Sequence, residues 1–418
     1  MGWSRILGVQ MVLLFMAITF TAGGVTQVDN SDLSQGGVNL WSISKAVIYL
    51  LPIVTLLALS LIRPVFFHSF LYVLKIFWIL IAFFVLAGIE LIWASSYDYS
   101  SVKLAIFGVS LISLFSLCAQ YLAVYQKTAN LLIYRHLLFS LTIVSFVLLY
   151  LGITQPVEGR NLFGIYVHPN EAASLFGTGF LLTLYYKSKL QEIGVLAMKH
   201  SFALYAFLLI STVVLLFCFS RGAMMAFFVG YFGALFLSYL FKQSSKFVFL
   251  IVGLSVITVL GYFLADLIAS ILAREKDGSD LQNLTGRTFI WQMILQQLNM
   301  QALLVGHGYG AISPKITVQL GHVALAGAHN SYLQVLAGTG LPGLILFIGF
   351  LLAAFNKFKR NLLQAANYNV DFLIGILLLM IVHGASEGFF GVNLSSPFGF
   401  FLFIYFTLVL NLKSKAGD

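Results

Sequence analysis

The sequence predicts an all-α polytopic membrane protein with about twelve transmembrane helices. Of its 418 residues, 60% are hydrophobic and only 9% are charged, and the mean hydropathy is +0.97. This composition excludes a water-soluble globular domain. Apolar runs of about 20 residues, long enough to cross a bilayer as a helix, recur along the whole chain. We expect spans at residues 5–24, 41–62, 66–94, 102–125, 132–153, 171–187, 200–219, 222–241, 247–272, 329–355, 370–386 and 395–412.

The first apolar segment has two interpretations. Arg5 precedes an apolar run that ends in Thr21-Ala22-Gly23-Gly24, and a cleaved signal peptide would show the same pattern. Multi-span proteins commonly use their first helix as the insertion signal, so we favour a retained helix.

Basic residues predict the orientation of the spans. They gather in alternate loops and in the tail, at Arg63, Lys127, Arg135, Lys187, Lys189, Lys199, Lys242, Lys246, Lys357, Lys359, Arg360, Lys413 and Lys415. By the positive-inside rule these loops face the cytoplasm, together with both termini. The net charge of +9 is therefore mainly a topology signal, and no basic cluster indicates nucleic-acid binding.

The organisation that we expect is a single transmembrane domain over residues 1–418 with one large external loop at 273–328, between the ninth and tenth spans. This loop carries a short amphipathic helix with Thr285 as its N-cap, followed by a flexible turn at 306–310. A loop of this length in a compact protein is usually functional.

Four short polar motifs fall on the external side, each beside the start of an expected helix. They are Arg160 with His168-Pro169-Asn170, Ser220-Arg221-Gly222, Thr285-Gly286-Arg287 and Ala328-His329-Asn330. Helix N-termini present unpaired N–H groups and a positive dipole end, which favour an anion, and arginine forks bind phosphate bidentately. A histidine beside such a site is suited to accept a proton. The motifs together predict a diphosphate clamp beside a general base.

Each candidate also has a structural interpretation. For Arg221 the structural alternative is an anchor at the membrane boundary. For Arg287 it is a solvated residue of a surface helix, and for Arg160 it is an ordinary loop residue. His329 is open to a role as a hydrogen-bonded histidine at a helix interface.

Metal ligation fits the sequence poorly. Asp277 and Asp280 are the one close pair of carboxylates in the large loop, and no His, Cys and carboxylate cluster has ligand spacing. We therefore expect neither a metal nor a cofactor.

In the order and spacing of its motifs, the second half of the chain resembles the bacterial O-antigen ligase and polymerase superfamily of membrane glycosyltransferases. The resemblance lies in Ser220-Arg221-Gly222, Gly286-Arg287 followed by Trp291, Gly306-His307-Gly308, Ala328-His329-Asn330-Ser331-Tyr332-Leu333 and Gly338-Thr339-Gly340-Leu341-Pro342-Gly343, with His168-Pro169-Asn170 upstream.

The resemblance implies a GT-C-type fold with its active site at the periplasmic face of a Gram-negative inner membrane. Ligases of this family transfer O-antigen glycan from undecaprenyl diphosphate to the lipid A–core oligosaccharide, with inversion and without a metal ion. By motif, His329 would deprotonate the acceptor hydroxyl, and Arg221 and Arg287 would bind the diphosphate, joined by Arg160. His168, Asn170 and Asn330 would line the same site.

Three alternatives stay open. An O-antigen polymerase would need the same arginines. A protein O-oligosaccharyltransferase is less favoured, because no substantial domain follows residue 412. A flippase for lipid-linked oligosaccharides would also be basic and aromatic, but transport predicts charged or broken-helix sites near mid-membrane, whereas these motifs lie at the external boundary.

Overall fold

A computed structural model describes residues 2–19, 40–126, 129–154, 169–195, 198–218, 220–242, 287–310, 328–364, 371–388, 390 and 394–414, and every regular element in these ranges is a helix. The N-terminal helices are α1 (Gly2–Thr19), α4 (Leu40–Ile62), α5 (Pro64–Ile76), α6 (Trp78–Ile89), the 3-10 helix η1 (Glu90–Trp93), α7 (Tyr97–Tyr125) and α8 (Ala129–Thr154). The remaining helices are α9 (Pro169–Glu192), α10 (Met198–Phe217), α11 (Arg221–Lys242), α14 (Arg287–Gln297), α15 (Met300–Val305), α17 (Ser331–Gln364), α18 (Phe372–Gly384) and α19 (Ser396–Ser414).

Six helices in the described ranges are long and apolar enough to cross a membrane, and the count rises to seven if the bent pair α5 and α6 is one span. The chain is therefore an all-α, multi-pass membrane protein. The expected span at 247–272 lies outside the described residues, so the total of twelve stays a prediction.

The expected span at 66–94 is strongly bent in the structure. The chain breaks at Phe77, where the axes on either side differ by 78°. The Phe77 ring is fully buried and stacks on Phe115 with centroids 4.7 Å apart. No proline or glycine lies at this position, so the local sequence gives no signal for the break. The break instead coincides with the packing of Phe77 against α7.

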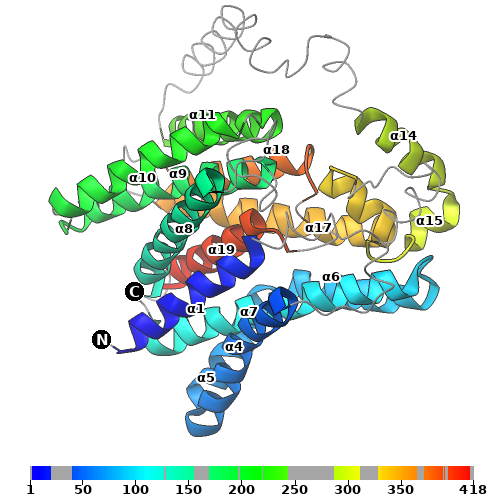
Figure 1. Ribbon diagram of the computed structural model, residues 1–418, viewed down its shortest axis with the longest axis horizontal. Coiled ribbons are helices and arrows are strands. Elements are labelled where there is room, and N and C mark those ends of the chain that lie inside the picture. The colour runs from blue at the N-terminus through cyan, green and yellow to red at the C-terminus, as the bar shows by residue number, and fades with distance from the viewer. Residues whose placement is uncertain are drawn as a thin grey trace, which may run out of the picture.

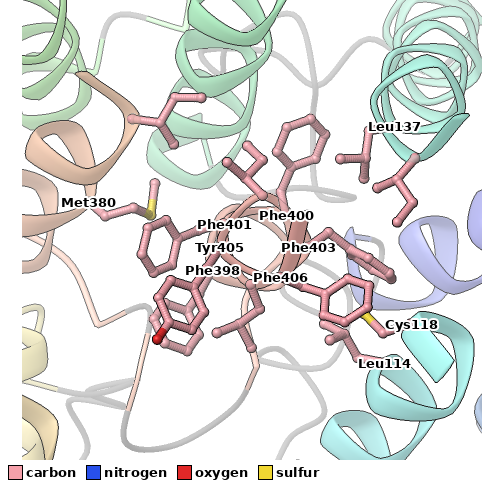
Figure 2. Packing of buried hydrophobic residues seen from close by; sticks show 14 of the residues in the cluster. Leu114, Cys118, Leu137, Met380, Phe398, Phe400, Phe401, Phe403, Tyr405 and Phe406 are labelled. Carbon is pink, nitrogen blue, oxygen red and sulfur yellow. The ribbon is translucent and has the colours of Figure 1, made fainter. Parts of the chain in front are cut away.

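Helix α19 forms the centre of the bundle. Every residue from Ser396 to Val409 is buried, which fits a helix that is apolar on all faces. Figure 2 shows its aromatic side chains radiating toward Leu114 and Cys118 of α7, Leu137 of α8 and Met380 of α18. The core therefore joins early and late parts of the chain.

The first helix belongs to this core. The Phe15 ring of α1 lies 5.5 Å from that of Phe400, measured between centroids, and Leu7, Met11 and Leu14 are fully buried. In Figure 1, α1 begins and α19 ends on the same side, away from α14 and α15. This packing is what a retained first helix requires.

Helices α11 and α18 cross at two glycines. A Cβ atom on Gly230 would lie 2.6 Å from the Gly375 carbonyl oxygen, and a Cβ on Gly375 would lie 2.5 Å from that of Gly230. Small residues at such crossings let helix backbones approach closely in membranes. This crossing holds the start of α11 beside the end of α18.

The Gly230→Ala substitution is expected to destabilise the protein by about 1–3 kcal/mol, because the added methyl group meets backbone rather than a movable side chain. Thermal unfolding in detergent, followed by size-exclusion chromatography, measures the effect. Gly349→Ala is the matched control, since a Cβ there meets nothing within 4 Å, and its midpoint should not fall. Equal midpoints for Gly230→Ala and the wild type would contradict this account of the crossing.

Candidate active site at the starts of α9, α11 and α17

The polar motifs open helices, as the sequence predicts. Helix α9 begins at Pro169, α11 at Arg221, α14 at Arg287 and α17 at Ser331. Local chemistry explains two further details. The Ser220 hydroxyl accepts from the Ala223 N–H at 3.3 Å, and the Asn330 side-chain oxygen accepts from the Leu333 N–H at 3.0 Å. Both residues act as N-caps, which confirms that these motifs mark helix starts.

His329 lies in the turn immediately before α17, with an unusual backbone conformation. Its φ angle is 47°, in the left-handed region that is uncommon for residues other than glycine. The turn is held at Ala328, whose N–H donates to Gln334 Oε1 at 2.9 Å and whose carbonyl accepts from Trp291 Nε1 at 2.8 Å. Non-glycine residues in this region cluster at functional sites.

Glu387, in the turn after α18, is a side-chain partner of His329. His329 Nδ1 lies 3.1 Å from Glu387 Oε2, and the two side chains are 27% and 12% exposed. The Asn170 side-chain amide donates to Glu387 Oε1, and the Ser331 hydroxyl donates to the Glu387 carbonyl at 2.8 Å. Glu387 therefore connects the start of α9 to the start of α17.

The motif Ser220-Arg221-Gly222 reaches the same place. A Cβ atom on Gly222 would lie 2.5 Å from Ser386 Oγ, so the start of α11 presses against the turn that carries Glu387. Three helix N-termini thus meet around one carboxylate, and their helix dipoles give this end of the bundle a positive electrostatic character.

The Gly222→Ala substitution should displace the Ser386–Glu387 turn, because its methyl group overlaps the Ser386 hydroxyl. We expect the loss of activity to be about 10-fold, and we expect Ser386→Gly in the same chain to restore most of it. A kinetic double-mutant cycle measures this coupling. Independent, additive effects of the two changes would contradict the close approach.

Helix α14, which begins at Arg287, packs against the His329 turn. Ile290 and Ile294 pack with Ala328 and Ala337, and Trp291 supplies the hydrogen bond to Ala328. The Trp291 indole N–H therefore fixes the turn. Thr285, the expected N-cap, lies outside the described residues.

The turn at 306–310 is not the flexible connection that the sequence suggests. The His307 and Gly308 N–H groups donate to the carbonyls of Ala337 and Gly338 at 2.9 and 3.0 Å, and Ser95 N–H donates to the His307 carbonyl at 2.8 Å. Tyr309 is fully buried, which raises the pKa of its phenol well above the usual value. The turn is therefore packed and hydrogen-bonded between the end of η1 and α17.

A break in α17 makes room for the turn at 306–310. Thr339 and Gly340 have non-helical backbone angles inside the helix, and a Cβ on Gly306 would lie 2.2 Å from the Gly338 carbonyl oxygen. Figure 1 shows α14 and α15 lying beside α17, with α6 on its other side. The glycine motifs are thus explained by close backbone packing.

The remaining predicted site residues divide into three groups. Asn330 caps α17, and its side-chain N–H also donates to the Ala385 carbonyl at 3.1 Å. Arg221 and Arg287 are the first residues of α11 and α14, but their side chains lie outside the described part. Arg160 and His168 lie wholly outside it. The binding of a diphosphate by the three arginines therefore stays a prediction.

Glu387 is the residue whose place in the site the sequence does not reveal. Glu387 lies just after an apolar helix, and Glu171 lies at the start of another, both near the expected external boundary. Nothing in the sequence spacing of the two residues brings them together. In the structure Glu171 Oε1 accepts from the N–H and hydroxyl of Ser396 at 2.9 and 3.0 Å. The two carboxylates also interact electrostatically. Among the described residues, no group of three or more His, Cys, Asp or Glu side chains could hold a metal ion.

Residues 204–348 match the family model described as O-antigen ligase. The match covers about a third of the chain and includes Arg221, Arg287 and His329, whereas Asn170 and Glu387 lie outside it. No curated protein matches the chain. This match supports, for residues 204–348, the similarity to the O-antigen ligase and polymerase superfamily that the motifs indicate.

Proposed function

We propose that the protein is an O-antigen ligase. It transfers glycan from undecaprenyl diphosphate to the lipid A–core oligosaccharide at the periplasmic face of a Gram-negative inner membrane, with inversion and without a metal ion. The donor and acceptor are its two partners, and the donor's polyprenyl chain reaches the site from the surrounding membrane lipid.

The observation that carries this proposal is the meeting of His329, Asn170 and the start of the Arg221 helix around Glu387. The proposed base therefore lies beside a region suited to anions at one end of the bundle, which supports the proposal. Glycosyl transfer from a lipid diphosphate needs both of these at neighbouring atoms.

In the proposed reaction, His329 Nε2 takes the proton of the acceptor hydroxyl while the acceptor oxygen bonds to the anomeric carbon. The bond between that carbon and the diphosphate oxygen breaks, and its electron pair departs with undecaprenyl diphosphate. Attack opposite the leaving group inverts the anomeric centre. A positioned base contributes about 10²- to 10⁴-fold to such a step.

Arg221 and Arg287 bind the leaving diphosphate in this proposal, with Arg160 as a third candidate. Negative charge on the diphosphate grows as the glycosidic bond breaks, so preorganised guanidinium groups stabilise the transition state more than the bound donor. This differential binding accelerates the reaction itself.

The test is transfer by purified protein in detergent with undecaprenyl-diphosphate-linked glycan and rough lipopolysaccharide, in EDTA and without nucleotide. Glycan attached to lipid A–core supports the proposal. Longer lipid-linked glycans without lipopolysaccharide modification would instead indicate a polymerase. Movement of intact donor across proteoliposome membranes without any transfer would indicate a flippase.

A further inference from the structure

We propose that Glu387 is a positioning residue that orients His329 and fixes which of its ring nitrogens acts as the base. This inference rests on the function proposed above. It assigns a role to a carboxylate that lies 58 residues beyond His329 and outside the region matched by the family model.

The first step of the argument is the contact between Nδ1 and the carboxylate. Glu387 Oε2 lies 3.1 Å from His329 Nδ1, and an ionised carboxylate only accepts hydrogen bonds. Nδ1 therefore carries the hydrogen, and Nε2 carries the lone pair that accepts the substrate proton. The carboxylate selects the productive tautomer.

The second step is that Glu387 is itself held in place. Asn170 donates to its other carboxylate oxygen, Ser331 donates to its carbonyl at 2.8 Å, and its own N–H donates to the His383 carbonyl at 2.8 Å. The side chain is only 12% exposed. Both carboxylate oxygens have partners, so the group is arranged to orient a neighbour.

The third step distinguishes a role of Glu387 in orienting His329 from a role in holding α17 against α18. Besides the Ser331 bond to the Glu387 carbonyl, two hydrogen bonds join these segments: Asn330 donates to the Ala385 carbonyl at 3.1 Å and Tyr332 donates to the Ile381 carbonyl at 2.8 Å. The contact between His329 and Glu387 adds a negative charge beside the imidazole, and that charge stabilises the imidazolium formed during proton transfer.

The decisive variant is Glu387→Gln. Its amide oxygen accepts from His329 Nδ1, and its NH₂ group donates to Asn170 after the Asn170 amide turns over, so the geometry survives while the charge is lost. The matched control is Glu171→Gln, which removes a neighbouring carboxylate charge but leaves an oxygen to accept from Ser396.

We expect Glu387→Gln to lower kcat by about 10- to 10²-fold, the usual effect of losing a residue that orients a functional histidine. The KM values for both substrates should stay within about threefold of the wild type, because neither substrate touches Glu387 in this proposal. Glu171→Gln should lower kcat by less than Glu387→Gln does, because its remaining side-chain oxygen still accepts from Ser396.

A chemical readout tests the same point without catalysis. Diethyl pyrocarbonate modifies neutral imidazole, and His329, 27% exposed, can be followed by mass spectrometry of its peptide. In Glu387→Gln the rate of this modification at a fixed pH should differ from that of the wild type, because the contact at Nδ1 is changed, and in Glu171→Gln it should change less.

The outcomes are distinct. A changed modification rate together with a fall in kcat at constant KM supports the inference. An unchanged modification rate, an unchanged kcat, or equal effects of the two substitutions would overturn it. If the wild type transfers no glycan to lipid A–core, the proposed function fails, while the modification rate still decides whether Glu387 controls the imidazole.

Discussion

The His329→Asn variant is expected to lose glycan transfer, with kcat lower by about 10²- to 10⁴-fold, the usual contribution of a positioned general base. Asparagine suits this position because it tolerates the left-handed backbone that His329 adopts with φ of 47°. Its side-chain amide can donate to Glu387 where Nδ1 now lies. The variant therefore keeps the turn and removes only the proton acceptor.

The measurement is single-turnover transfer with saturating donor and acceptor, together with the donor dissociation constant. Donor affinity should stay within about threefold, because a base that acts on the acceptor hydroxyl contributes little to donor binding. His329→Ala serves as a comparison, since it adds backbone strain of about 1 kcal/mol to the loss of the ring. Turnover of the well-folded His329→Asn protein at the wild-type rate would exclude the general-base role.

Replacement of either Arg221 or Arg287 by alanine is expected to lower kcat/KM for the donor by about 10²- to 10³-fold, as for removal of one preorganised donor to a developing charge. Both residues begin helices beside the His329 turn. Lysine at either position should restore only part of the loss, because an ammonium group keeps the charge but lacks the bidentate fork.

Arg63→Ala is the control for these variants, since Arg63 precedes α5 and falls on the opposite, cytoplasmic side in the expected topology. It should leave kcat/KM unchanged. Full activity of both Arg221→Ala and Arg287→Ala would show that the leaving group is bound elsewhere, and Arg160 would become the next candidate.

The sequence predicted well those features that short stretches of chain encode. The starts of α11 and α17 follow from capping by Ser220 and Asn330, and the start of α9 follows from Pro169, whose fixed φ suits a first helical position. The apolar runs likewise predicted helices, because the need to cross a bilayer sets their length and composition.

The features that the sequence did not reveal depend on distant packing. The break at Phe77 has no proline or glycine beside it and coincides with stacking on Phe115. The turn at 306–310 looked flexible because three glycines suggest freedom, yet those glycines allow close approach to Ala94 and Gly338. Glu387 meets Asn170 across 217 residues, a pairing that one sequence cannot show.

The long sequence separation of these contacts has a consequence for biosynthesis. Helices enter a membrane in the order of translation, but His329 contacts Glu387, which lies after α18. A ribosome-bound chain that has inserted only its earlier helices therefore lacks the group that orients the imidazole. Competence to handle a reactive lipid carrier should arise only when the final helices have joined the bundle.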